Sequence, residues 1–85
     1  MSFDELIREV SSLKMSSGQL AIMFSSAGQS IQGDTNAIAS IVRGSRSGQE
    51  AVVALGIATK SLLDAAASLK TMERTCDECI NQLSR

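Results

Sequence analysis

The one motif in this chain that has the residue types of a chemical site is Cys76-Asp77-Glu78-Cys79. A structural zinc site takes four Cys or His ligands, whereas the chain has two cysteines and no histidine. A reactive thiol pair gains its reactivity at a helix N-terminus, but this motif comes near the end of a predicted helix and carries two acids that disfavour the thiolate. Three interpretations stay open: small apolar side chains of a core, a disulfide or intermolecular cross-link, or a metal shared across a dimer.

The remaining polar residues lack the partners that catalysis requires. Without histidine, the commonest general base is missing and the many serines have no base to activate them. The acids Asp64 and Glu73, and likewise Asp77 and Glu78, form no recognisable acid/base pair and are typical of solvated helix faces. The glycines match neither a phosphate-binding loop nor a dinucleotide-binding pattern. We therefore expect no enzyme, no catalytic residue, no cofactor site and no metal site within one chain.

Composition favours helices packed closely against each other. The 85 residues allow one domain at most, and their aromatic content is only 2%, so a core has to come from Leu, Ile, Val, Ala and Met. Proline, which interrupts helices, is absent. Eight basic and nine acidic residues are spread along the chain, which argues against nucleic acid as a partner because phosphate binding needs a basic stripe.

Membrane and export signals are also not evident. No run of apolar residues approaches the roughly 20 that span a bilayer, so we expect no stable membrane insertion. The N-terminus begins with acids at Asp4 and Glu5 and lacks the basic segment and apolar core of a signal peptide. We expect a cytoplasmic protein that, if exported, leaves the cell without a cleaved leader.

A turn is predicted at about residues 43–48. Gly44 suits the left-handed residue that closes a helix, because it has no Cβ to clash. Ser47 and Glu50 have the spacing of a capping box, which starts a helix. A stop signal followed at once by a start signal predicts a helical hairpin.

We therefore expect an all-α fold, with residues 1–85 forming a single hairpin domain. Helix 1 covers about 3–43, the turn 44–47 and helix 2 about 48–83. Ser2 and Glu5 form the capping box of the first helix. A break within residues 33–36, which would give three helices, is the alternative, because Gly33 is followed by two possible N-caps, Asp34 and Thr35.

Apolar residues recur in each half at steps of three and four, which is the pattern of a helix that pairs with another along one strip. We call this strip the predicted seam. In the first half all its members but Ser17 and Asp34 are apolar, and it predicts a helix on the order of 60 Å long. It consists of Phe3, Leu6, Val10, Leu13, Ser17, Leu20, Phe24, Ala27, Ile31, Asp34, Ile38 and Ile41. In the second half it consists of Val52, Leu55, Thr59, Leu62, Ala66, Leu69, Glu73, Cys76, Ile80 and Leu83.

Further apolar residues beside both seams exceed what one pair of helices covers. Examples are Ile22 and Met23 in the first half and Ile57 and Met72 in the second. The surplus predicts that a second hairpin, a copy or a different chain, completes a four-helix bundle. The partner interface is predicted to contain Leu6, Val10, Leu13, Leu20, Phe24, Ile31, Leu55, Leu62, Leu69 and Ile80. The small residues around Ala65-Ala66-Ala67 are either a docking groove for a partner helix or simply good helix formers.

The length, the two arms and the turn resemble the W-x-G family of small type VII secretion (ESX-like) helical-hairpin proteins. The family's turn tripeptide aligns with Arg46-Ser47-Gly48, so that the glycine is kept and the tryptophan is replaced by arginine; Gly44 precedes it, as in the flank of that motif. The chain is similar in particular to the tryptophan-free helical proteins that accompany LXG toxins in Gram-positive bacteria. The family's export signal is an aromatic followed four residues later by an acid, and the nearest match here is Leu69 with Glu73.

The resemblance implies a non-enzymatic hairpin, either a small secreted substrate or a targeting chaperone for a larger effector such as an LXG-type toxin. Its partner would be a second copy, a related hairpin or the helical N-terminal region of a toxin, and the assembly would be presented to the secretion machinery. One alternative is a needle-like or chaperone component of type III secretion. Another is a cytosolic coiled-coil adaptor or a thiol-based redox or metal sensor.

Overall fold

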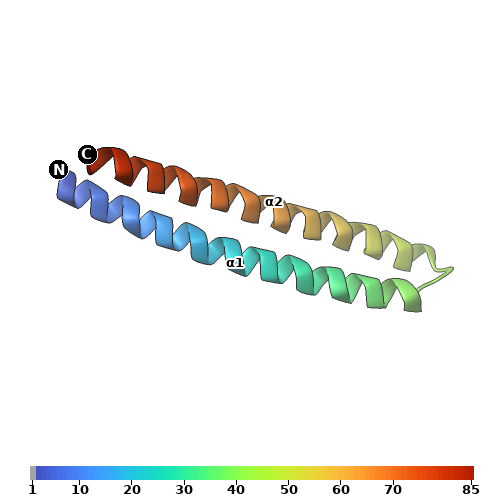
Figure 1. Ribbon diagram of the computed structural model, residues 1–85. Helices are drawn as coiled ribbons and strands as arrows, with labels where there is room; N and C mark the ends of the chain where they lie inside the picture. Colours follow the sequence, from blue (N-terminus) through green and yellow to red (C-terminus); the bar gives the residue numbers. More distant parts are fainter. Residues whose placement is uncertain (1) are drawn as a thin grey trace.

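The chain forms two long antiparallel helices joined by a short turn (Figure 1). The computed structural model describes residues 2–85. Helix α1 covers Phe3–Ile41 and helix α2 covers Arg46–Leu83. The hairpin measures 62 × 18 × 13 Å, and both chain ends lie at the end opposite to the turn. The predicted all-α helical hairpin is confirmed.

Helix α1 starts where the sequence predicts and continues without a break. Ser2 is its N-cap, and the side-chain oxygen of Ser2 accepts a hydrogen bond of 3.2 Å from the backbone N–H of Glu5. Residues 33–36 are helical, and the Thr35 hydroxyl donates to the carbonyl of Ile31 at 2.6 Å instead of starting a new helix. The three-helix alternative is therefore not the observed fold.

The turn lies two residues earlier than predicted, and the N-cap of α2 is a different serine. Gly44 has a φ of 82°, which confirms the left-handed residue. The predicted capping box of Ser47 and Glu50 is wrong, because Ser45 is the N-cap of α2 and its hydroxyl accepts from the N–H of Gly48 at 3.2 Å. Gly44 reverses the chain at once, so the next residue already has the extended backbone of an N-cap. Helix α1 consequently ends at Ile41 and α2 begins at Arg46, each two residues before the expected position.

The predicted seam of α2 faces α1. Its members Thr59, Ala66 and Cys76 are buried. All its other members are half-buried, and most of the residues between them are exposed. The sequence pattern therefore located the contact strip of this helix correctly.

The predicted seam of α1 is wrong at Phe3, Leu13, Leu20, Asp34 and Ile41, which are exposed, whereas its members Leu6 and Ala27 are half-buried. The side facing α2 instead includes Gly28 and the residues that directly follow Leu13, Leu20, Asp34 and Ile41. We call the corrected strip the observed seam. It consists of Val10, Lys14, Ser17, Ala21, Phe24, Gly28, Ile31, Thr35, Ile38 and Val42.

Small residues in the observed seam explain this rotation of α1. Ser17, Ala21 and Gly28 are buried, and a Cβ added to Gly28 would lie 3.0 Å from Cδ2 of Leu63. Leu62 and Leu63 of α2 therefore lie against Gly28 of α1, where a larger side chain would not fit without a shift. The buried set of residues 2–85 contains only small side chains, namely Ser17, Ala21, Gly28, Thr35, Thr59, Ala66 and Cys76.

Candidate interaction surface

The two cysteines lie on and beside the seam of α2. Cys76 is 6% exposed and points into the hairpin, and Cys79 is half-buried next to it; neither forms a disulfide. The interpretation of Cys76 as a small apolar core residue is confirmed. Within residues 2–85 there is no group of three or more His, Cys, Asp and Glu side chains that could hold a metal ion.

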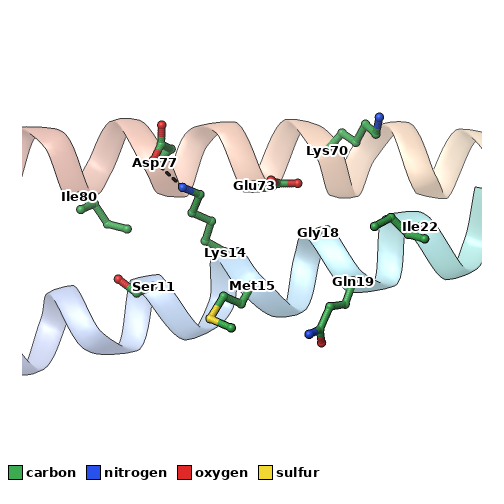
Figure 2. Close-up of a pocket in the computed structure, with 10 residues that line it drawn as sticks. All are labelled: Ser11, Lys14, Met15, Gly18, Gln19, Ile22, Lys70, Glu73, Asp77 and Ile80. Atoms are coloured by element: carbon green, nitrogen blue, oxygen red, sulfur yellow. Dashed lines mark hydrogen bonds and ion pairs between the residues drawn. The ribbon is translucent and has the colours of Figure 1, made fainter.

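A cleft lies between the helices near the chain ends, on the side shown in Figure 2. It forms because Ser11 and Gly18 of α1 have little side chain to fill the space beside α2. Lys14 crosses it and donates to the Asp77 carboxylate at 2.7 Å. This hydrogen bond, together with the attraction between the two charges, raises the pKa of Lys14 above its ordinary value. The cleft has both charged and apolar lining residues, and the Lys14–Asp77 ion pair, whose side chains are 37% and 51% exposed, joins α1 and α2 across it.

The residues compared with an export signal, Leu69 and Glu73, both lie on the seam and are half-buried. A Cβ added to Gly18 would lie 3.0 Å from Oε2 of Glu73, so this carboxylate lies against the backbone of α1. A recognition signal needs side chains that a receptor can reach. In this hairpin Leu69 and Glu73 instead face α1, so a receptor could reach only part of each side chain.

One broad side of the hairpin is uncharged over a stretch of roughly 26 Å at 1.5 Å per residue, from Leu13 to Ser30 on α1 and from Ala58 to Thr75 on α2. Helical spacing from the observed seam places Leu13 and Leu20 of α1 on this side, together with the alanines Ala58 and Ala65 of α2. We call this surface the uncharged face. Its apolar members are Leu13, Leu20, Met23 and Ala27 of α1 and Ala58, Ala65 and Met72 of α2, and the polar residues among them are Ser16, Ser30, Ser61, Ser68 and Thr75.

The large side chains of the uncharged face are substantially open to solvent. Met23 is 61% exposed, Leu13 48%, Met72 45% and Leu20 39%. The opposite side also has exposed apolar residues, such as Ile22, but these lie among charged groups that include Lys70. The two sides of the hairpin therefore differ in charge more than in apolar content.

The predicted partner residues are divided between two surfaces. Leu13 and Leu20 lie on the uncharged face, where a partner can reach them. Leu6 is half-buried beside them, near the chain ends. The seams hold the remaining members, which contact within the hairpin: Val10, Phe24, Ile31, Leu55, Leu62, Leu69 and Ile80. The sequence analysis did not assign Ala58 and Ala65 of α2 to the uncharged face. The seven-residue spacing of these two alanines was a signal that could have identified them.

The three alanines around Ala66 lie at different places on α2. Ala66 is buried on the seam, where it lets the helices approach, and Ala65 lies half-buried at the edge of the uncharged face. Ala67 points to the opposite side and is exposed. The three alanines therefore do not form one continuous groove.

The turn motif has one residue with a steric role and one on the surface. Gly48 lies against Val42, and a Cβ added to Gly48 would lie 2.7 Å from Cγ2 and 3.0 Å from Cγ1 of that valine. Arg46, at the position of the family's tryptophan, has a 94% exposed side chain 3.4 Å from the Glu50 carboxylate. Ser47 is exposed in the first turn of α2. The glycine of this motif is therefore needed where the helices converge, whereas the arginine is not.

Within residues 2–85, α2 is the one helix long and apolar enough to cross a membrane by length and composition alone. The search for an uninterrupted apolar run did not find this segment, because Lys60 and Asp64 lie within it. These two residues form a surface ion pair at 3.0 Å. Core helices of soluble proteins pass the same test. The absence of membrane insertion therefore stays a prediction.

No known protein family, curated protein or solved structure matches this chain. The likeness to the W-x-G proteins accordingly stays a prediction that rests on the turn motif, the length and the helical pattern.

Proposed function

We propose that this chain is a non-enzymatic partner-binding hairpin of a type VII secretion system, acting as a small secreted substrate or as a targeting chaperone for a larger effector. The observation that carries the proposal is the uncharged face, with its exposed Leu13, Leu20, Met23 and Met72. Contiguous apolar surface of this kind marks protein interaction sites.

The energetics of the hairpin support a partner. Long helices depend on tertiary packing more than on intrinsic propensity, and α1 is rich in serine and glycine, which are poor helix formers. The contact between α1 and α2 buries only small side chains completely. Leu13, Leu20 and Met72 are already more than half buried in the hairpin. A partner that covered the rest of each side chain would therefore add about 0.7–1.5 kcal/mol, roughly half of what full burial contributes.

The assignment to type VII secretion is supported by the resemblance and by the steric role of Gly48. Gly48 of the turn motif lies against Val42 at the end of α1, where an added Cβ would meet the valine side chain. Since Leu69 and Glu73 lie largely within the hairpin, we propose that a partner supplies part of the export signal. The assembled bundle would then be the species that the secretion machinery recognises.

An export assay in the cells that produce the protein tests this proposal. Deletion of the membrane ATPase of the type VII system should abolish the appearance of the chain, or of the effector it accompanies, in the culture medium. If the chain itself is exported, it is a substrate; if only the effector is exported, it is a chaperone. Unchanged export of both after the deletion would contradict the type VII assignment.

The partner-binding part is tested separately by placing a charge on each side of the hairpin. Leu20→Asp charges the uncharged face, and Ile22→Asp charges the opposite side at a residue that is 69% exposed. We expect the first variant, but not the second, to lose its partner in co-purification. Equal retention in the two variants would show that the uncharged face is not the binding surface.

A further inference from the structure

The two cysteines lie three residues apart on α2 and belong to different surfaces of the hairpin. Cys76 is 6% exposed and lies on the seam. Cys79 is half-buried and continues the seven-residue row of Ala58, Ala65 and Met72 on the uncharged face. One thiol is therefore enclosed between the helices, and the other lies beside it at the edge of the surface proposed for a partner.

We infer that Cys76 and Cys79 are a modification site, at which an intramolecular disulfide forms when the chain meets a small disulfide such as oxidised glutathione. This inference rests on the proposed function, because export moves a protein from a reducing to an oxidising compartment. It adds a regulation of the uncharged face. The reduced hairpin binds its partner, and oxidation weakens that binding.

A disulfide between these positions requires only a small change of α2. Side chains three residues apart on a helix are neighbours, with about 5–6 Å between their Cβ atoms. A disulfide needs about 3.5–4.5 Å between these atoms. The motif lies close to the end of α2 at Leu83, beside the chain ends (Figure 1). The last turn of a helix often adopts the tighter 3₁₀ geometry, so the shift can be confined to the segment after Cys76.

Burial determines the order in which the two thiols react. A small disulfide reaches Cys79 at the edge of the seam, whereas Cys76 is enclosed. The Cys79 thiolate attacks one sulfur of oxidised glutathione, which gives a mixed disulfide and releases one glutathione thiolate. The Cys76 thiolate then attacks Sγ of Cys79 and displaces the second glutathione thiolate. The protons of the two cysteine thiols pass to the two glutathiones, so the protein pair is oxidised and one glutathione disulfide is reduced.

The acids of the motif do not prevent this exchange. Asp77 pairs with Lys14 at 2.7 Å, which offsets part of the negative charge between the two cysteines. Disulfide exchange of ordinary thiols takes seconds to hours, so the site needs no activated thiol to become oxidised after export. The pair is therefore a dithiol that is oxidised once, and not a catalytic redox centre.

Oxidation changes the partner surface at the end of the hairpin where the chain ends lie. Drawing Cys79 toward Cys76 moves its side chain away from the uncharged face. The same tightening of α2 shifts Ile80 and Leu83, which are half-buried against α1. Because interfaces are packed as closely as protein interiors, such shifts lower the affinity for a partner.

The site is tested on the purified full chain, which is reduced and then incubated with oxidised glutathione under native conditions. Mass spectrometry and thiol alkylation identify the product. We expect wild type to lose both free thiols without keeping a glutathione, and Cys76→Ser to stop with one glutathione bound to Cys79. We expect the enclosed thiol of Cys79→Ser to react at least tenfold more slowly than the thiol of Cys76→Ser. Circular dichroism verifies that both variants keep their helices.

The matched control moves the second thiol to another side of α2. Cys79→Ser combined with Asn81→Cys keeps two cysteines, but helical spacing places the exposed position 81 away from Cys76. This variant should bind one glutathione and form no internal disulfide. Three results with wild type overturn the inference: two thiols that stay free, a glutathione that stays bound, or a cross-link between two chains. An internal disulfide that forms equally fast in the control overturns it too.

The regulation is tested on the complex that co-purifies from the cells that produce the protein. Oxidised glutathione should lower the amount of retained partner at least fivefold for wild type and leave it unchanged for Cys79→Ser. Equal retention by the two overturns the regulation. If no partner co-purifies with reduced wild type, the proposed function and the regulation both fail, while an internal disulfide in the purified chain still establishes the site.

Discussion

Replacement of Gly48 by alanine should destabilise the hairpin although it improves the helix propensity of α2. The added Cβ would overlap Cβ of Val42 and come within 2.7 Å and 3.0 Å of the two γ-carbons. Rotation of the valine side chain relieves only the γ-carbon contacts, because Cβ is fixed to the backbone. The turn between α1 and α2 must therefore move.

The size of this effect follows from two opposing contributions. Overpacking of this kind costs about 1–3 kcal/mol. The higher helix propensity of alanine offsets up to about 1 kcal/mol of this loss in the free energy of unfolding. We expect a net loss of about 1–2 kcal/mol for Gly48→Ala, which corresponds to a fall in Tm of roughly 5–15 °C for a chain of this size.

The matched control is Gly56→Ala in the same helix, because a Cβ at Gly56 has no atom within 4 Å. This variant should be stabilised by about 0.5–1 kcal/mol. Thermal and urea unfolding followed by circular dichroism at one protein concentration measures both changes; the concentration is held constant because self-association would add to the stability.

The contact with Val42 is identified by a double-mutant cycle. Val42→Gly removes the atoms that the new Cβ would meet, so the combined change should cost less than the sum of the two single changes. Two results would refute the close contact between Gly48 and Val42. The first is that Gly48→Ala stabilises the hairpin as much as Gly56→Ala does. The second is that the free-energy changes of Gly48→Ala and Val42→Gly add fully in the double variant.

Three further predictions concern the seam, the turn and the cross-helix ion pair. Ala66→Leu should lower the free energy of unfolding by about 1–3 kcal/mol because this residue is 6% exposed on the seam, whereas the exposed Ala67→Leu should stay within about 0.5 kcal/mol; urea unfolding that gives equal effects contradicts the assigned seam. Gly44→Ala should cost about 1 kcal/mol, since φ is 82° there, and a more stable variant in thermal unfolding would contradict the turn geometry. Because Asp77 raises the pKa of Lys14, the stability that the ion pair contributes is complete below the unfolded pKa of about 10.4 and is lost as the pH rises through the folded value. The difference in stability between wild type and Lys14→Met should therefore shrink as the pH rises above about 10.4, and an unchanged difference opposes the pairing.

The strip of α2 that faces α1 could be predicted because its larger members lie on the seam. Leu55, Leu62 and Leu69 recur at seven-residue intervals and all face α1. Other large apolar residues of α2, such as Ile57 and Met72, are exposed, but leucine recurs at seven-residue intervals only on the seam. Hydrophobic periodicity therefore identified the contact side of α2, and the prediction was correct.

The corresponding strip of α1 could not be predicted by the same reasoning. Leu13 and Leu20 have the spacing of a seam but lie to one side of it, while Ala21 and Gly28 are buried. Apolar side chains that serve a second surface have the same spacing as those that serve the first, so periodicity alone does not separate them. The small residues next to each leucine were the available signal.

The turn was located correctly, but its N-cap was displaced by two residues. Ser45 and Ser47 are equivalent by residue type, and Glu50 favoured Ser47 through the spacing of a capping box. The choice depends on how soon the chain reverses after Gly44, which is set by the contact between Val42 and Gly48. Such a contact between two helices is a tertiary property that local spacing does not contain.

The central claim is that another helical surface covers the uncharged face in the functional protein. Thiol labelling tests it directly, with Ser68→Cys on the uncharged face and Ala67→Cys on the opposite side, each in a chain whose native cysteines are replaced by alanine and expressed in the cells that naturally produce it. Both positions are exposed in the single hairpin. We expect the introduced thiol at position 68 to react at least tenfold more slowly than the one at position 67; equal and fast reaction at both positions would contradict the claim.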